Sequence, residues 1–325
     1  MFGWRRAIKR AVQAARATTT RPTTTLCLLI KDEGIYLSEW LAHYLTLGFD
    51  RIVIYDNGSC SETRHIERVC ASADARISLI DWQDQPGVNP QISAYSHALE
   101  NCKTEWIAFF DTDEFLVLKS SRSIADFLSN AGRKVGAVAI NWLFFGSNGE
   151  TAYRPEPVTE RFPRCAQDGS RMFKSIVRTR AASAMSHPHS ATLRNGFSYV
   201  DADMNETALL DPARLPHVTL GTAQINHYVL RSAEEYAWKR QRGNSTLPDG
   251  HPKKFAKFDN ADLFWKNHDH KNRVDTAVVQ WTRKAAEMRS RFESAAASDY
   301  DVAIVAPSAI RFQLEPSETA KQGIK

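Results

Sequence analysis

The chain has 325 residues, 43% of them hydrophobic and 24% charged, which are the proportions of an ordinary soluble globular protein. Its net charge of +5 tolerates an anionic ligand or membrane surface but gives no reason to expect nucleic acid as a partner. The 5 cysteines are odd in number and no pair has CxxC spacing, so neither a disulfide framework nor a zinc site is indicated and reduced thiols are expected.

Residues 1–24 are predicted to be a basic N-terminal segment followed by a Thr-rich linker. Met1 to Arg16 lacks the continuous apolar stretch of a signal peptide, and no run in the chain approaches the ~20 apolar residues of a spanning helix. A frayed terminus is the first interpretation, and a basic amphipathic helix on an anionic bilayer is the second. We therefore expect a cytoplasmic protein, with peripheral contact to the inner face of the membrane as an option.

Strands and helices alternate in the next part of the chain. The predicted elements are strands at 26–30, 51–55, 77–80 and 106–110, and helices at 35–47, 63–70 and 89–101. Gly48 fits the position just after the end of the first helix. This alternation predicts an α/β protein with a mostly parallel sheet and right-handed crossovers.

The second half is less regular. Its predicted elements are strands at 135–142, 174–178 and 224–230, a loop at 154–169, and helices at 232–240 and 275–296. Residues 301–325 are expected to form a loosely ordered tail.

Asp111 and Asp113 stand one residue apart where the apolar strand at 106–110 should end. In open α/β sheets, ligands bind outside the carboxyl ends of the strands. Two neighbouring carboxylates repel each other unless a cation or a proton compensates them. A hard divalent metal takes oxygen ligands and often holds a substrate diphosphate, so the pair predicts a metal site.

Two functional interpretations of this pair and a third for the whole protein are open, and a solvated turn is the structural alternative. One is the metal site of a nucleotide-sugar glycosyltransferase. Another is the DxDx(T/V) signature of aspartyl phosphatases, in which Asp111 would be the nucleophile, but Phe115 stands where that signature has Thr or Val. The third is a catalytically inactive nucleotide-binding protein.

Several further motifs, in order from about residue 25 to residue 280, resemble the family 2-like and family 92-like glycosyltransferases. The matching segments are Ile30 to Trp40, His43-Tyr44, Leu47 to Asp50, Ile54 to Ser59, Trp106 to Phe115, Asn226 to Tyr228, Arg231 to Tyr236 with Lys239, and Phe264 to Asp275. The resemblance implies a glycosyltransferase A-type, Rossmann-like α/β fold in a single domain at 25–300. Residues 25–118 would bind the nucleotide and 119–300 the acceptor.

The resemblance also implies a reaction and its participants. A sugar would pass from a nucleoside diphosphate donor to a hydroxyl of a glycan or lipid-linked acceptor, with inversion and with Mn²⁺ or Mg²⁺. Surface polysaccharide or lipopolysaccharide synthesis is the usual setting of such enzymes.

Particular residues are assigned to this site. Asp111 and Asp113 would hold the metal, and the resemblance suggests a histidine as a further ligand, His227 or its competitor His187. Lys31, Glu33, Asp56 and Asn57 follow the first two strands at the same sheet edge as Asp111 and would contact the donor; an Asx-turn is the local alternative for Asp56 and Asn57.

Other roles rest on residue type. Glu160 and Asp203 are the leading candidates for the general base in the acceptor half, beside Asp201 and Glu206. Basic side chains that could neutralise a diphosphate are Lys174, Arg178, Lys239, Arg240 and Arg242. The segment Trp142 to Gly146 could stack on a sugar or simply pack in the core.

Overall fold

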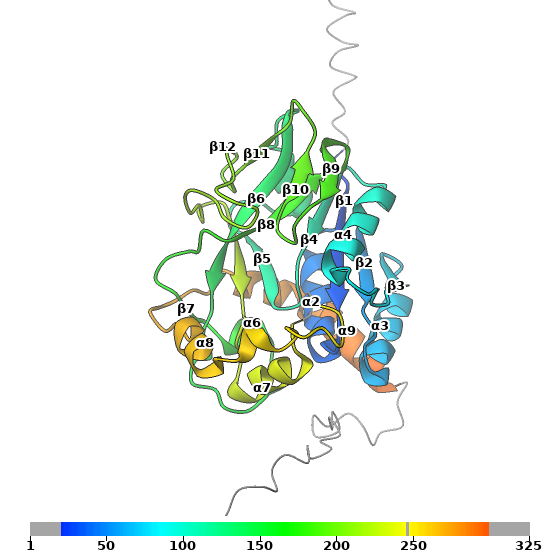
Figure 1. The fold of residues 1–325 in the computed structure, drawn as a ribbon, viewed down its shortest axis with the longest axis vertical. Coiled ribbons are helices and arrows are strands. Elements are labelled where there is room, and N and C mark those ends of the chain that lie inside the picture. The colour runs from blue at the N-terminus through cyan, green and yellow to red at the C-terminus, as the bar shows by residue number, and fades with distance from the viewer. Residues whose placement is uncertain (1–20, 245–246, 299–325) are drawn as a thin grey trace, which may run out of the picture.

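The structure is a computed structural model that describes residues 21–244 and 247–298 (Figure 1). The expectations for the basic segment up to residue 20 and for the tail at 301–325 lie outside the described residues. Within the described part of the chain, no helix combines the length and the apolar character needed to cross a membrane.

The regular elements follow one another in an α/β order. The strands are β1 (Thr24–Ile30), β2 (Arg51–Asp56), β3 (Ile77–Asp81), β4 (Trp106–Phe109), β5 (Glu114–Leu118), β6 (Val135–Phe144), β7 (Arg164–Cys165), β8 (Phe173–Arg178), β9 (Ala182–Met185), β10 (Ala191–Leu193), β11 (Ser198–Val200), β12 (Glu206–Thr207), β13 (Ala223–His227) and β14 (Arg273–Val274). The helices are α2 (Gly34–Thr46), α3 (Ser61–Ala73), α4 (Pro90–Asn101), α5 (Ile124–Leu128), α6 (Val158–Arg161), α7 (Ala233–Arg242), α8 (Ala261–His268) and α9 (Val279–Ser298), with short 3₁₀ turns at Thr179–Ala181 and Ala256–Phe258.

The central sheet is mixed, with a parallel first half. The strand order is β12-β11-β6-β8-β4-β1-β2-β3, and β13 pairs with both β5 and β6. β4, β1, β2 and β3 run parallel, whereas β8 is antiparallel to both β4 and β6. The carboxyl ends of β1, β2 and β4 therefore meet at one edge, as the sequence predicted.

The two faces of β1 explain why this strand is apolar throughout. Leu26, Leu28 and Ile30 belong to the core cluster that includes α2 and α9, whereas Cys27 and Leu29 belong to the cluster that includes α4. A strand buried on both faces has no polar side to show, so its sequence is a continuous apolar run. Figure 1 shows α2, α3 and α9 grouped at the lower right of the molecule.

The main differences from the predicted elements lie around the Asp111 turn. The apolar residues after it form a strand of their own, β5, which pairs antiparallel with β13. The strand predicted at 224–230 ends at His227, and the Tyr228 backbone N–H continues the register with β5 for one more hydrogen bond, to the Asp113 carbonyl at 2.8 Å. The loop predicted at 154–169 contains the short elements α6 and β7.

Gly146 follows β6 for a packing reason. A Cβ added there would lie 2.2 Å from the His270 carbonyl oxygen, so only glycine admits the 268–270 segment. Trp142 and Phe145 are buried, at 6% and 0% exposure. Of the two interpretations of this segment, the structure therefore favours core packing for these residues.

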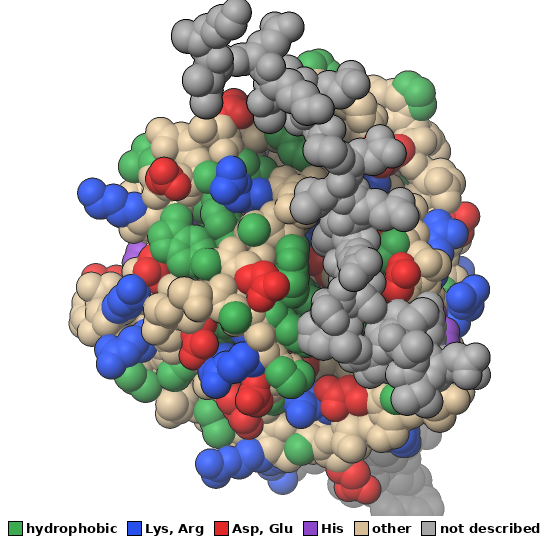
Figure 2. Space-filling view, turned by 90° about the horizontal axis from the view of Figure 1, so that it is seen from below, with side chains coloured by type: hydrophobic (Ala, Val, Ile, Leu, Met, Phe, Trp, Pro, Cys, Tyr) green, Lys and Arg blue, Asp and Glu red, His purple; other side chains and the backbone are tan. Residues whose placement is uncertain are grey.

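The surface shows no gathering of basic charge on the face seen from below. In Figure 2 acidic, basic and apolar side chains are interspersed outside the grey atoms. A nucleic-acid-binding surface would show a basic stripe, and the part of this face outside the grey atoms shows none.

A buried carboxyl on α3 should make stability depend on pH. Burial, together with the nearby Asp56 carboxylate, raises the pKa of Glu67 from 4.5 to about 8, and its Oε1 is buried without a partner. The folded state therefore keeps a proton that the unfolded chain releases, so stability falls as the pH rises from 4.5 towards 8. Between pH 5 and pH 8, the decrease in the free energy of unfolding should be smaller in Glu67→Gln than in wild type, by on the order of 2 kcal/mol. Urea unfolding at several pH values measures this difference.

The control for this experiment is Glu287→Gln, which changes an exposed carboxyl on α9. It should keep the wild-type pH profile. Parallel profiles for wild type and Glu67→Gln would contradict the expectation.

Candidate functional site

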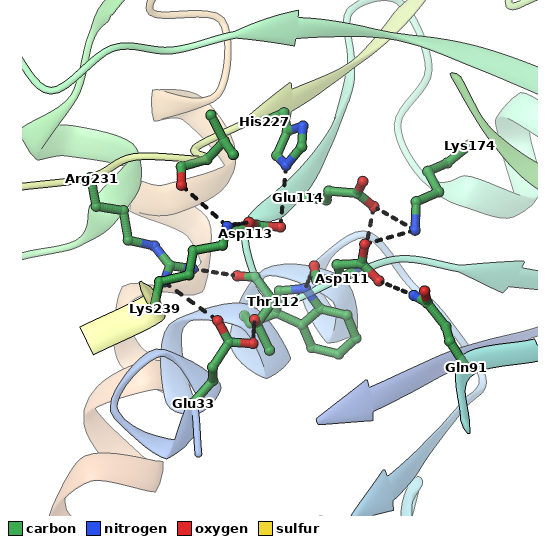
Figure 3. Close-up of polar contacts among 12 residues, drawn as sticks. Glu33, Gln91, Asp111, Thr112, Asp113, Glu114, Lys174, His227, Arg231 and Lys239 are labelled. Atoms are coloured by element: carbon green, nitrogen blue, oxygen red, sulfur yellow. Dashed lines mark hydrogen bonds and ion pairs between the residues drawn. The ribbon is translucent and has the colours of Figure 1, made fainter. Parts of the chain in front are cut away.

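The Asp111–Asp113 turn is held by its backbone. The Trp40 indole Nε1 on α2 donates to the Asp111 carbonyl at 2.9 Å, and the Glu114 N–H donates to the same oxygen at 3.0 Å. With the Tyr228 bond to the Asp113 carbonyl, these contacts fix both aspartates at the carboxyl edge of β4 (Figure 3).

Asp111 has a complete set of partners. Its Oδ1 accepts from Gln91 Nε2 at 2.8 Å, and its Oδ2 lies 2.9 Å from Lys174 Nζ (Figure 3). The Tyr95 hydroxyl, which like Gln91 is on α4, also donates to Oδ1, at 3.1 Å. Burial alone would raise the pKa of Asp111, but the Lys174 ammonium outweighs it and the pKa is lowered. Asp111 is therefore an ionised carboxylate that is already neutralised.

Glu114 lies beneath this pair and completes the Lys174 environment. It is fully buried, its Oε2 lies 3.5 Å from Lys174 Nζ, and its Oε1 has no partner. Burial raises the pKa of Glu114 well above its usual value, and Lys174 offsets this only in part. Glu114 thus lies against both Lys174 and the Asp111 backbone, whose N–H donates to Glu114 Oε2 at 3.0 Å.

Asp113 faces a lysine and a histidine. Lys239 Nζ of α7 lies 2.5 Å from Asp113 Oδ2, and His227 Nε2 lies 3.4 Å from Asp113 Oδ1 (Figure 3). Burial would raise the pKa of Asp113, but Lys239 and His227 bring it well below its usual value. Burial also lowers the pKa of His227. Its Nδ1 is buried without a hydrogen-bond partner.

Glu33 is bound to the same turn from the other side. The Thr112 hydroxyl donates to Glu33 Oε2, Arg242 Nη1 lies 2.8 Å from the same oxygen, and Arg231 Nη1 lies 3.7 Å from Oε1. Arg231 also donates to the Thr112 carbonyl at 3.2 Å. Glu33 thus ties α7 to the aspartate turn, and its oxygens are engaged.

Lys31, Asp56 and Asn57 lie where the sequence predicted, at the ends of β1 and β2. Asp56 accepts from the Ser59 N–H at 2.9 Å and pairs with Arg64 at 2.8 Å, so the local turn interpretation holds for it. Lys31 Nζ pairs with Asp249 Oδ2 at 2.6 Å.

Asn57 has an unused acceptor. Its Nδ2 donates to the Trp82 carbonyl and to Asp84 Oδ1, each at 2.9 Å, which fixes the orientation of the amide. The Asn57 side chain is buried, and its Oδ1 has no partner. A buried acceptor without a donor is costly, so a ligand that donates a hydrogen bond would be stabilised here.

A cavity of about 300 Å³ adjoins the site. It lies between the N-termini of α2 and α3 and helix α7, and its walls include Glu33, Arg231, Lys239 and Arg242. The cavity is therefore bordered by Lys239, the lysine that pairs with Asp113.

Other predicted residues lie elsewhere. His187 stacks near His189, with ring centroids 5.1 Å apart, rather than against either aspartate. Glu160 is exposed on α6, and no hydrogen bond or ion pair among the described residues joins it to Asp111 or Asp113. Asp203 accepts a hydrogen bond from Thr222, before the start of β13, whereas His227 ends that strand.

The structure also separates the basic candidates. Arg178 lies beside Trp106 at the start of β4, away from the aspartate edge, and pairs with Glu105. Arg240 is exposed. Lys174, Lys239 and Arg242 are the three that reach the site.

Sequence reasoning missed the partners of these charged groups. Gln91, Tyr95 and Asp84 received no role, and Glu33 was not linked to Arg231. One sequence feature could have indicated two of these partners. Gln91 and Tyr95 are four residues apart in the helix predicted at 89–101, so they lie on the same face of that helix.

An α/β domain with paired aspartates after a central strand, beside a histidine and several cations, has the construction of a nucleotide-sugar glycosyltransferase of the A type. The model of glycosyltransferase family 92 matches residues 26–262, and the chain belongs to this family.

Curated relatives agree with the family assignment. A family 92 protein of Ricinus communis is 27% identical over 228 residues, which are 68% of this chain and 38% of the relative. One of Oryza sativa subsp. japonica is 28% identical over 184 residues, 54% of this chain and 30% of the relative. The chain thus spans well under half the length of these relatives.

Solved glycosyltransferase structures are more distant. The Staphylococcus aureus protein TarS, in complex with UDP-GlcNAc, is 15% identical over 49% of this chain and 46% of its own, with a TM-score of 0.34. Glucosyl-3-phosphoglycerate synthase of Mycobacterium tuberculosis, with Mn²⁺, UDP and phosphoglyceric acid, is 16% identical over 53% of this chain and 60% of its own, with a TM-score of 0.28.

Proposed function

We propose that this protein transfers a sugar from a nucleoside diphosphate sugar to an acceptor hydroxyl, with a divalent cation and with inversion at the anomeric carbon. The observation that carries the proposal is the pair Asp113 and His227, a carboxylate and an imidazole 3.4 Å apart at the carboxyl edge of the sheet. The family assignment supports the reaction class.

The donor set fits a divalent cation in part. Asp113 Oδ1 and His227 Nε2 are 3.4 Å apart, close to the spacing of neighbouring ligand atoms on a cation with bonds of about 2.1 Å. The described residues contain no group of three or more His, Cys, Asp or Glu side chains that could hold a metal. Asp113 and His227 would hold Mn²⁺ or Mg²⁺, and diphosphate oxygens would supply the other ligands. When bound, the cation stabilises the negative charge of the leaving diphosphate.

The protein's own side chains perform the remaining work in this proposal. Lys31, Asp56 and Asn57 bind the nucleoside, and the free Asn57 Oδ1 accepts a hydrogen bond from it. Lys239 and Arg242 face the diphosphate, where charge-assisted hydrogen bonds favour the departing anion. Asp111 is oriented by Gln91, Tyr95 and Lys174 beside the donor.

The acceptor side of the proposal rests on the family resemblance. A carboxylate must take the proton of the acceptor hydroxyl, and Glu160 and Asp203 stay hypotheses for that base. The acceptor is proposed to be a glycan or lipid-linked glycan of surface polysaccharide or lipopolysaccharide, assembled on the cytoplasmic side of the membrane.

A nucleotide panel tests the proposal. UDP or GDP with Mn²⁺ should raise the melting temperature, because a ligand at 100 times its Kd adds about 2.7 kcal/mol to the stability. Release of the same nucleotide from its sugar donor should depend on the metal. If no nucleotide shifts the melting temperature with or without Mn²⁺, the proposal fails.

The same assays separate the two alternatives. A phosphatase would release inorganic phosphate from monoesters, and Asp111→Asn would abolish that release. An inactive binding protein would show the thermal shift but would release no sugar at any Mn²⁺ concentration.

A further inference from the structure

Two lysines already neutralise the two aspartates of the site. Lys174 Nζ lies 2.9 Å from Asp111 Oδ2, and Lys239 Nζ lies 2.5 Å from Asp113 Oδ2. The two carboxylates thus face two ammonium groups. The charge at the aspartates is balanced before any metal or nucleotide arrives.

The two lysines differ in their freedom to move. Lys174 stands on the central strand β8 with 1% of its side chain exposed, enclosed by Asp111 and Glu114. Lys239 stands on α7 with 14% of its side chain exposed, and it borders the cavity of about 300 Å³. Its other hydrogen bond is to the Val229 carbonyl at 3.1 Å. A lysine ammonium on a flexible stem can leave a carboxylate for a nearby anion, provided that there is room.

We propose that Lys239 is the resident counter-cation of Asp113, and that a divalent metal replaces it only when a nucleoside diphosphate binds as well. This inference rests on the proposed function and assigns Lys239 the control of metal entry. A metal bound to Asp113 Oδ1 without a nucleotide would lie close to the Lys239 ammonium, which pairs with Oδ2 of the same carboxylate. Two positive charges this close together repel each other strongly in a buried site. Two protein ligands are also too few to replace the water molecules that the metal ion gives up on binding.

A diphosphate removes both obstacles. Its negative charge offsets the added cation, its oxygens fill the remaining coordination positions, and it offers Lys239 a new partner beside the cavity. Metal and nucleotide should therefore each bind weakly alone and strongly together. By thermodynamic reciprocity, each raises the affinity for the other by the same factor.

Metal binding without nucleotide gives the sharpest test. Mn²⁺ binding to the full chain is measured by electron paramagnetic resonance and by calorimetry, with and without UDP or GDP. Lys239→Met should bind Mn²⁺ alone about fivefold or more tightly than wild type, because Asp113 loses its competitor. The factor by which nucleotide raises the Mn²⁺ affinity should fall about tenfold.

Two further variants complete the test. Lys266→Met removes an exposed lysine of α8 and should match wild type in every measurement. Lys239→Gln removes the charge and keeps a hydrogen-bond donor, so it replaces Lys239→Met if that variant does not fold, with the same expectation.

Each outcome has a distinct meaning. If removal of the Lys239 charge leaves the Mn²⁺ affinity unchanged or weaker while wild type still binds the metal–nucleotide pair, the inference is overturned and the proposed function stands. If wild type binds no nucleotide at any Mn²⁺ concentration, the proposed function itself fails.

Discussion

Asp113→Ala should reduce metal-dependent sugar transfer by roughly 1,000-fold, the upper end of what the loss of one electrostatic catalytic contact costs. The Asp113 carboxylate contacts both His227 and Lys239. Its removal would leave His227 as the single protein ligand in the proposed site, and Lys239 without its counter-ion. The fold should persist, because the Tyr228 N–H bonds the backbone carbonyl of residue 113 rather than its side chain.

The measurement is nucleotide release as a function of Mn²⁺ concentration, together with circular dichroism. Asp259→Asn, which changes an exposed carboxylate before α8, is the control and should retain wild-type rates. Retention of more than a tenth of wild-type, metal-dependent turnover by Asp113→Ala would remove Asp113 from the metal site.

Arg161→Met should lower the stability of the domain by about 3–5 kcal/mol, a large part of the 5–15 kcal/mol typical of folded proteins. Arg161 makes two bonds to Glu235, at 2.9 and 2.8 Å, and the side chains are 2% and 0% exposed. Glu235 also forms the capping box of α7 with Ser232. Without Arg161 the protein must bury an unpaired carboxylate or protonate it.

Thermal unfolding should show a drop on the order of 10 °C. Arg154→Met is the matched control, because its pair with Glu150 is largely exposed, at 48% and 31%, and should contribute less than about 1 kcal/mol. A loss of stability no larger than that of the control would show that the buried pair contributes little.

The pH dependence gives a second check on the same pair. Burial would raise the pKa of Glu235, but Arg161 outweighs it and the pKa is lowered. The pair therefore stabilises the fold above the unfolded pKa of about 4.5, and this contribution is lost as the pH falls through the lower folded value. The difference in stability between wild type and Arg161→Met should shrink as the solution is acidified.

Local patterns were sufficient to predict the nucleotide half of the fold. β1, β2, β3 and β4 are short apolar runs between helices with helical periodicity, and each was confirmed within about two residues at its ends. The end of an apolar run is a local property, so the placement of Asp111, Asp56 and Lys31 at one sheet edge also followed from the sequence. The glycosyltransferase family was correctly predicted from motifs in order along the chain.

The charge balance of the site could not be predicted in this way. Lys239 lies 126 residues after Asp113 and Lys174 lies 63 residues after Asp111. These pairings exist only because β8 pairs with β4 and α7 places Lys239 against the turn that follows β4. From sequence alone, a single lysine is expected to be a solvated surface group, because lysines are rarely buried. Whether a particular lysine is buried depends on elements that are distant in the chain.

The sequence by itself thus determined the class of protein, the sheet edge and the two aspartates, since each depends on residues that are neighbours in the chain. Only the tertiary structure decided which cation each aspartate holds, that Glu114 is buried beside Lys174, and that Glu33 binds Arg242 instead of standing free. These are consequences of burial and of distance through space, which no local pattern of residues encodes.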